Sequence, residues 1–226
     1  MYADKSNYHG VILVMGSRIM HLIIGYKIAE RLNIEDKTSF LLGSIAPDAV
    51  VTKDESHFYR GEHQNYTRHI DYLEFLSKYK SYSDHIYVLG YFAHLIADEQ
   101  WMKGFYMPWL RNRMEADPEV SSLYHGDFQL LNGKLLEQYD FTHEMREAIN
   151  NKTNKVIDLD EVKSSDVLEF VPHVLGDMEY EKQVINAPLN VFHFMQIEGY
   201  VETSVNVAVM NLQQLSGKEK KGQHTL

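Results

Sequence analysis

The sequence of 226 residues contains no cysteine. Such a chain forms no disulfide, and it has no thiolate to serve as a metal ligand or as a nucleophile. Any metal site must therefore be built from histidine and carboxylate side chains. The 12 histidines and 32 acidic residues are the available donors.

Long apolar runs are also missing. The N-terminal stretch 11–20 is apolar but is broken by Arg18, follows no basic segment and shows no small-residue cleavage pattern. No run approaches the roughly 20 residues that a helix needs to cross a bilayer. We therefore expect a cytoplasmic chain without a membrane span, for which a peripheral membrane contact stays open.

Positive charge is scarce, because 22 basic residues face 32 acidic ones and the net charge is -10. Proteins that bind DNA or RNA neutralise phosphates with clustered lysine and arginine, so a nucleic-acid polymer is not an expected partner. A small phosphoester is still compatible with this charge, since divalent metal ions can supply positive charge within the site.

The composition and periodicity predict a single helical domain. Apolar residues make up 44% and charged residues 24% of the chain, which is typical of globular proteins. Alternating strand patterns are missing, so we predict an all-α fold, an irregular helical bundle with the metal site between helices. The expected organisation is an N-terminal extension (1–15), a helical domain (16–215) and a polar tail (216–226).

Apolar residues at helical spacing predict the individual helices. They are expected at 19–33, 37–46, 65–79, 84–101, 103–114, 119–138, 142–149, 164–178 and 191–215. Pro172 should interrupt the helix at 164–178, and 50–64 should form a loop. Gly43 marks a place where two backbones can pack closely.

The strongest pair of polar residues is His94 and Asp98. They lie four residues apart on a predicted helix and therefore face the same way. Their neighbours are mostly apolar, and an ionised aspartate in a core needs a partner. A metal cation would be such a partner, although a simple hydrogen bond between the two side chains is the alternative.

Three further residues are candidates for the same site. His21 lies on the apolar face of the first helix, Asp48 follows Pro47 at a helix end, and His57 lies on the loop. Each has an ordinary alternative: a core histidine, a turn or capping carboxylate, and a surface histidine. Together with His94 and Asp98 they offer three nitrogen donors and two carboxylates, a set that suits zinc or a similar ion.

Four segments occur in an order that is familiar: Met20-His21-Leu22, Gly43-Ser44-Ile45-Ala46-Pro47-Asp48, Ser56-His57-Phe58, and Gly90-Tyr91-Phe92-Ala93-His94-Leu95-Ile96-Ala97-Asp98-Glu99. In this arrangement the sequence resembles bacterial zinc-dependent phospholipases C over about residues 15–105. The resemblance implies a hydrolase that splits phosphoester bonds with metal-activated water. It implies zinc as cofactor, in two or more ions, with another divalent metal as the alternative. The substrate would be a phosphoester, with phospholipids among the candidates.

The resemblance also implies residue roles. His57, His94 and Asp98 would hold one zinc ion, and His21 with Asp98 would hold another. Asp48 would lie nearby, as a metal ligand or as the catalytic general base toward the attacking water.

The sequence departs from the family in its remaining ligands. Secreted members use an N-terminal tryptophan, but the first tryptophan here is Trp101. They also use a later His-x-x-x-Glu motif, which here lies at a different distance from Asp98. The weaker metal-ligand candidates are Asp127, His125, His143 and Glu147. For Asp127, which follows His125 on a predicted helix, a solvated helix face is the alternative. His173 and His193, among apolar residues, are expected in the core.

Two other functions stay open at this point. One is a different helical metal-dependent phosphohydrolase that acts on small soluble phosphoesters, although the contiguous His-Asp pair of one such superfamily does not occur here. The other is a non-catalytic protein stabilised by a metal, which would bind a partner through the aromatic cluster at 105–110. That cluster has a core position as its ordinary alternative.

Overall fold

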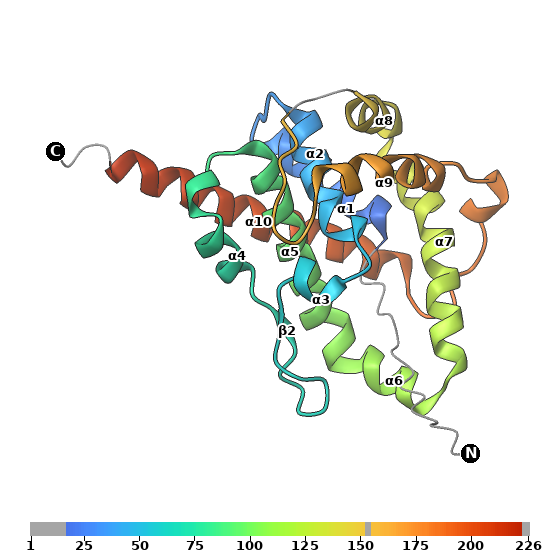
Figure 1. Cartoon of the computed structure of the whole chain (residues 1–226). Helices are drawn as coiled ribbons and strands as arrows, with labels where there is room; N and C mark the ends of the chain where they lie inside the picture. The colour runs from blue at the N-terminus through green and yellow to red at the C-terminus, as the bar shows by residue number, and fades with distance from the viewer. Residues whose placement is uncertain (1–16, 152–154, 223–226) are drawn as a thin grey trace, which may run out of the picture.

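The structure is a computed structural model that describes residues 17–151 and 155–222 (Figure 1). Helices dominate these residues, and the sheet they contain is a single pair of two-residue strands. The predicted all-α class and single domain are confirmed. The expected extension at 1–15 lies outside the described residues.

Four helices build the centre: α1 (Arg18–Arg31), α2 (Lys37–Ile45), α5 (Ile86–Trp101) and α10 (Phe194–Gly222). Helix α5 is buried on nearly all sides, as expected for a helix whose apolar residues surround its axis. Helices α1, α2 and α10 all pack against it. The site therefore forms around the most enclosed helix of the chain.

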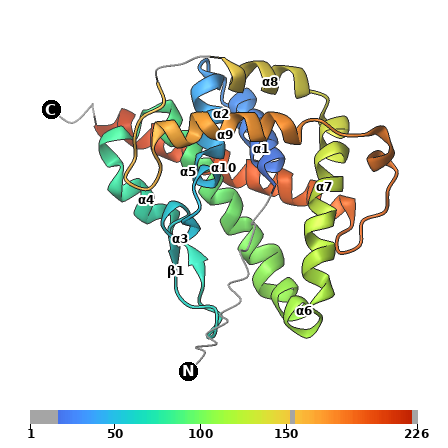
Figure 2. The same cartoon turned by 45° about the vertical axis from the view of Figure 1, so that its right-hand side comes forward.

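The outer elements cover this centre. They are η1 (Ala46–Ala49), α3 (Lys53–Ser56), α4 (Tyr72–Lys78), η2 (Lys80–Tyr82), α7 (Glu119–Tyr139), α8 (Thr142–Asn150), α9 (Ser164–Asp177) and η4 (Lys182–Ile185). In both cartoon views α9 crosses over α1, while α4 and α7 lie on opposite sides of the molecule (Figures 1 and 2). Strand β1 (Tyr59–Arg60) pairs antiparallel with β2 (His69–Ile70), and Tyr59 lies opposite Ile70.

Two glycines let α2 and α5 touch backbone to backbone. A Cβ atom on Gly43 would lie 2.0 Å from the carbonyl oxygen of Tyr87, and one on Gly90 would lie 2.0 Å from that of Phe40. Any larger residue would force the helices apart. The close packing predicted at Gly43 is confirmed, with Gly90 as its counterpart.

The segment between α2 and α5 differs most from the prediction. The stretch expected to be a loop contains α3 and β1, and the helix expected from residue 65 begins only at Tyr72. Asp71 caps that helix, because its side chain accepts a hydrogen bond from the backbone N–H of Glu74 at 2.9 Å. The residues just before Asp71 form strand β2, which pairs with β1.

Pro47 follows the end of α2 as predicted, but Pro108 and Pro172 lie inside helical segments. Helix α5 continues through the π-helical segment η3 (Met102–Leu110), which contains Pro108, into α6 (Arg111–Ala116). The wider π turn accommodates a residue without an N–H donor. Helix α9 runs through Pro172, and its buried valines hold it against the centre. Helix α10 reaches Gly222, past the predicted end at 215.

The core is continuous under these helices and includes the start of α1, most of α5 and the middle of α10. Across residues 17–151 and 155–222, no helix combines the length and apolar character that a membrane crossing needs.

Candidate metal centre

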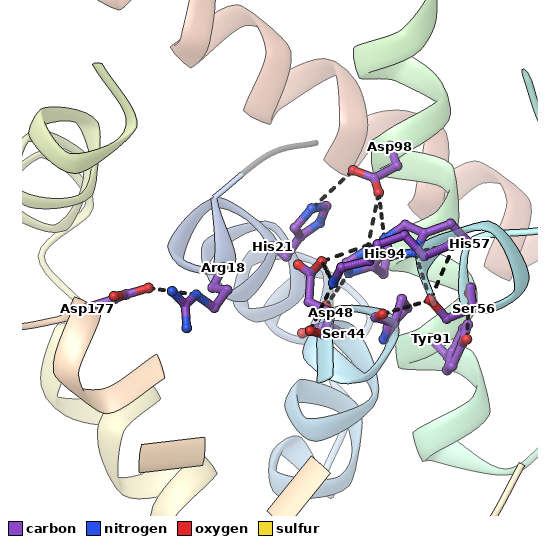
Figure 3. A network of polar contacts seen from close by, with 12 residues as sticks. Arg18, His21, Ser44, Asp48, Ser56, His57, Tyr91, His94, Asp98 and Asp177 are labelled. Carbon is purple, nitrogen blue, oxygen red and sulfur yellow. Dashed lines mark hydrogen bonds and ion pairs between the residues drawn. The ribbon is translucent and has the colours of Figure 1, made fainter. Parts of the chain in front are cut away.

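Separate elements bring the five predicted residues together (Figure 3). The side chain of Ser17 caps the start of α1 by accepting a hydrogen bond from the backbone N–H of Met20. His21 therefore lies in the first turn of that helix. Asp48 lies in η1, and His57 directly follows α3. His94 and Asp98 lie one turn apart on α5. In chain order the five are His21, Asp48, His57, His94 and Asp98.

Asp98 is the centre of the cluster. Its Oδ1 lies 3.1 Å from Nε2 of His21, and its Oδ2 lies 3.3 Å from Nε2 of both His57 and His94. The Nε2 atoms of His57 and His94 are themselves 3.3 Å apart. All four side chains are at most 3% exposed. Three imidazoles thus converge on one buried carboxylate.

Hydrogen bonds on the far sides of the rings fix which nitrogens face the cluster as acceptors. His94 Nδ1 lies 2.8 Å from the carbonyl oxygen of Ser44, and His57 Nδ1 lies 3.1 Å from that of Lys53. A carbonyl only accepts, so each Nδ1 carries a proton, and in the neutral form of the ring Nε2 keeps its lone pair. Burial, together with the neighbouring His21, lowers the pKa of His94 to about 4, so this ring is neutral at pH 7.

The donor set fits a zinc ion. His57 Nε2, His94 Nε2 and Asp98 Oδ2 are three electron-pair donors separated by 3.3 Å along each edge. An ideal tetrahedral site with zinc–ligand distances of about 2.0–2.1 Å has ligand–ligand edges of about 3.3–3.4 Å. The three atoms are therefore spaced like one face of such a tetrahedron. Without a cation between them, their lone pairs would repel.

A second group of donors overlaps the first. One ligand atom each from His21, Asp48 and His94 can be chosen so that all lie within 4.8 Å of one another. The rings of His21 and His94 stack with centroids 3.7 Å apart. His94 belongs to both groups, but its Nδ1 is occupied by Ser44, so it has one nitrogen to offer.

Asp48 is the member that meets solvent, with 13% of its side chain exposed. Its Oδ1 accepts from Lys53 Nζ at 2.8 Å and lies 3.6 Å from His57 Nε2. Burial by itself would raise the pKa of Asp48, but the neighbouring positive charge of Lys53 opposes burial, and the pKa lies well below its usual value. Asp48 is therefore ionised at neutral pH.

Several supporting residues were missed in the sequence. The hydroxyl of Ser56 donates to the carbonyl oxygen of Pro47 at 2.9 Å. The hydroxyl of Tyr91 donates to the backbone carbonyl oxygen of Ser56 at 2.5 Å. These bonds tie the segment around α3 to α5. Ser44 and Lys53 orient the ligand histidines through backbone carbonyls, which no side-chain pattern reveals. The position of Lys53 between two candidate ligands, Asp48 and His57, was the available signal.

The structure does not bring the weaker candidates into this cluster. Asp127 is buried on α7, where it accepts backbone hydrogen bonds from residues 190–192 at 2.8 to 3.1 Å. His125 is exposed and bonds to the backbone of its own helix. His143 and Glu147 form an exposed pair on α8, 3.4 Å apart. Asp127 thus supports the chain entering α10.

The core positions expected for two other histidines are wrong. His173 on α9 and His193 before α10 are both exposed. Each has buried apolar neighbours in the sequence, but its own side chain lies on the outer face of its segment. The sequence alone does not show which face of a segment packs inward.

The geometry defines a buried cluster of histidines and carboxylates that could hold a metal ion, in an all-helical fold. Residues 20–101 match the model of a family described as zinc dependent phospholipase C. All five cluster residues lie within the matched segment, and the predicted family is confirmed for it. Comparison with curated proteins and with solved structures gave no significant match.

Proposed function

We propose that this protein is a metal-dependent phosphoesterase of the phospholipase C type with zinc as its resident metal. The observation that carries the proposal is the triangle of His57 Nε2, His94 Nε2 and Asp98 Oδ2, whose 3.3 Å edges match a tetrahedral zinc site. The family match supports zinc over other divalent metals.

The residues would hold two ions. His57, His94 and Asp98 Oδ2 would bind the first. His94 has one nitrogen to offer, and the first ion would use it. A second ion would therefore rely on His21, on Asp48 and on Asp98 Oδ1, which lies 3.1 Å from His21 Nε2. Asp98 would then help to hold both ions, since its Oδ1 faces His21 and its Oδ2 faces His57 and His94.

Each part of the site has a chemical role. Bound zinc polarises a phosphoryl oxygen and lowers the pKa of water toward neutrality. Asp48 is ionised and reaches the surface, so it can orient an attacking water molecule and accept its proton. The backbone carbonyls of Ser44 and Lys53 would keep the histidine rings in place during this step.

The aromatic segment at 105–110 does not favour the non-catalytic alternative. Phe105, Tyr106 and Leu110 are all buried, and they pack in the core. The docking surface which that function would need is therefore mostly absent from the described residues. A soluble phosphoester and a phospholipid headgroup share the phosphoryl chemistry of the site, and an assay with both kinds of substrate separates them.

The test compares hydrolysis by the zinc-loaded wild type and by Asp48→Asn, with a soluble phosphodiester and with phosphatidylcholine micelles as substrates. We expect Asp48→Asn to keep the zinc ion held by His57, His94 and Asp98 and to lose about 10²–10⁴-fold in rate, the usual contribution of a positioned acid or base. The control is Asp84→Asn, which changes an exposed aspartate. A zinc-loaded wild type that hydrolyses neither substrate would refute the proposal.

A further inference from the structure

A cavity of about 510 Å³ opens at the exposed edge of the metal centre. Its walls come from the start of α1, the segment 48–53 and the face of α9 that carries Phe170 and His173. Asp48 is the cluster residue that lines it, while the other four side chains are at most 3% exposed. A substrate reaching the cluster through this cavity would meet Asp48 first.

Two cationic side chains lie in the wall of this cavity, Arg18 and Lys53. The Arg18 guanidinium is held by Asp177 at 2.8 Å (Figure 3). It also lies over the ring of Phe170, 5.3 Å from the ring centroid. Lys53 is paired instead with Asp48, a member of the cluster itself. Lys53 is therefore the cation nearer to the reacting end of the cavity.

The contacts of Lys53 leave it able to take a further partner. Its ammonium donates to the Asp48 carboxylate at 2.8 Å and to the Asp48 backbone carbonyl at 2.9 Å. An ammonium has three N–H donors, so one is left. The side chain is 28% exposed, and it belongs to the four-residue helix α3, outside the enclosed centre.

We propose that Lys53 is a phosphate-binding residue, whose ammonium contacts a phosphoryl oxygen of a phosphoester in this cavity. When Asp48 shares its negative charge with a metal ion, its attraction for Lys53 weakens and the ammonium can turn to the substrate. This inference rests on the proposed function for its substrate class. The cavity has room for a phosphate and a small polar alcohol, whether free or as the headgroup of a lipid.

The test measures binding of inorganic phosphate to the zinc-loaded full chain by calorimetry, with zinc content measured for each variant. We expect Lys53→Met to keep its zinc and to weaken phosphate binding about tenfold or more, the effect of losing one charge-assisted hydrogen bond. Lys53→Arg should restore most of the affinity, because it keeps the charge. The matched control is Lys37→Met, which removes an ion-paired lysine of similar exposure outside the cavity.

Two results would overturn the inference. One is unchanged phosphate binding in Lys53→Met. The other is loss of zinc together with phosphate binding, which would show that Lys53 only holds Asp48 in place. Phosphate binding that depends on Lys53 in a protein without hydrolytic activity would support the inference and refute the proposed function.

The same comparison with glycerophosphocholine and with phosphatidylcholine vesicles separates the two sources of the phosphoryl group. Loss of affinity in Lys53→Met for the soluble ester alone identifies small phosphoesters. An equal loss for both ligands identifies the headgroup as the part that is bound.

Discussion

Replacing Gly90 by alanine should disturb the metal centre without touching any of its ligands. The new Cβ would lie 2.0 Å from the carbonyl oxygen of Phe40, whereas ordinary contacts of this kind begin near 3.4 Å. Helices α2 and α5 would have to separate by more than 1 Å. Ser44 lies on α2, and its carbonyl bonds to His94 on α5 at 2.8 Å, so the same displacement would stretch that hydrogen bond.

The expected cost combines two opposing effects. Overpacking a core costs about 1–3 kcal/mol, and a clash with the rigid backbone of α2 places Gly90→Ala at the upper end. Alanine returns about 0.5–1 kcal/mol relative to glycine in a helix. We expect a net loss of about 2 kcal/mol in the free energy of unfolding. Loss of the outer hydrogen bond of His94 should also weaken zinc binding by about 10–100-fold.

Urea unfolding followed by circular dichroism measures the first effect, and competition with a zinc chelator measures the second. Gly126→Ala on α7 is the control, because a Cβ there meets no atom within 4 Å. That variant should gain about 0.5–1 kcal/mol from helix propensity. A Gly90→Ala protein as stable as the wild type, with unchanged zinc affinity, would refute the reasoning.

Four further predictions concern the proposed metal ligands, the bound metal and the weaker ligand candidates. Alanine at His94 or at Asp98 should remove bound zinc, as measured by elemental analysis. Chelation of the wild type should lower the melting temperature, since a ligand at 100 times its Kd stabilises the folded state by about 2.7 kcal/mol. Asp127→Ala should destabilise the fold by several kcal/mol, on the order of 1–3 for each buried donor left unpaired, and keep its zinc content. Alanine at His143 should change neither the free energy of unfolding nor the zinc content.

The outcomes that would contradict these predictions are specific. Zinc retained in both ligand variants would place the metal elsewhere, and an unchanged melting temperature after chelation would show that the ion does not stabilise the fold. Zinc lost from folded Asp127→Ala would return that residue to the ligand candidates. Zinc lost on substitution of His143 would do the same for the exposed pair on α8.

The sequence determined the helical class and the central site. Helical periodicity is local, because it depends on residues three and four positions apart, and most helices lie where it predicted them. His94 and Asp98 could be paired for the same reason. The order of the four motifs then predicted that His21, Asp48 and His57 lie beside them, a placement that spacing alone does not provide.

Only the tertiary structure decided the rest. Which face of a segment packs inward separated the buried Asp127 from the exposed His173 and His193, and this depends on neighbours distant in sequence. Backbone carbonyls orient the ligand rings, but a carbonyl is common to every residue and leaves no mark in a sequence. The role of Lys53 likewise follows from the fold, because a lysine becomes part of a site only when chain reversal places it against a carboxylate such as Asp48.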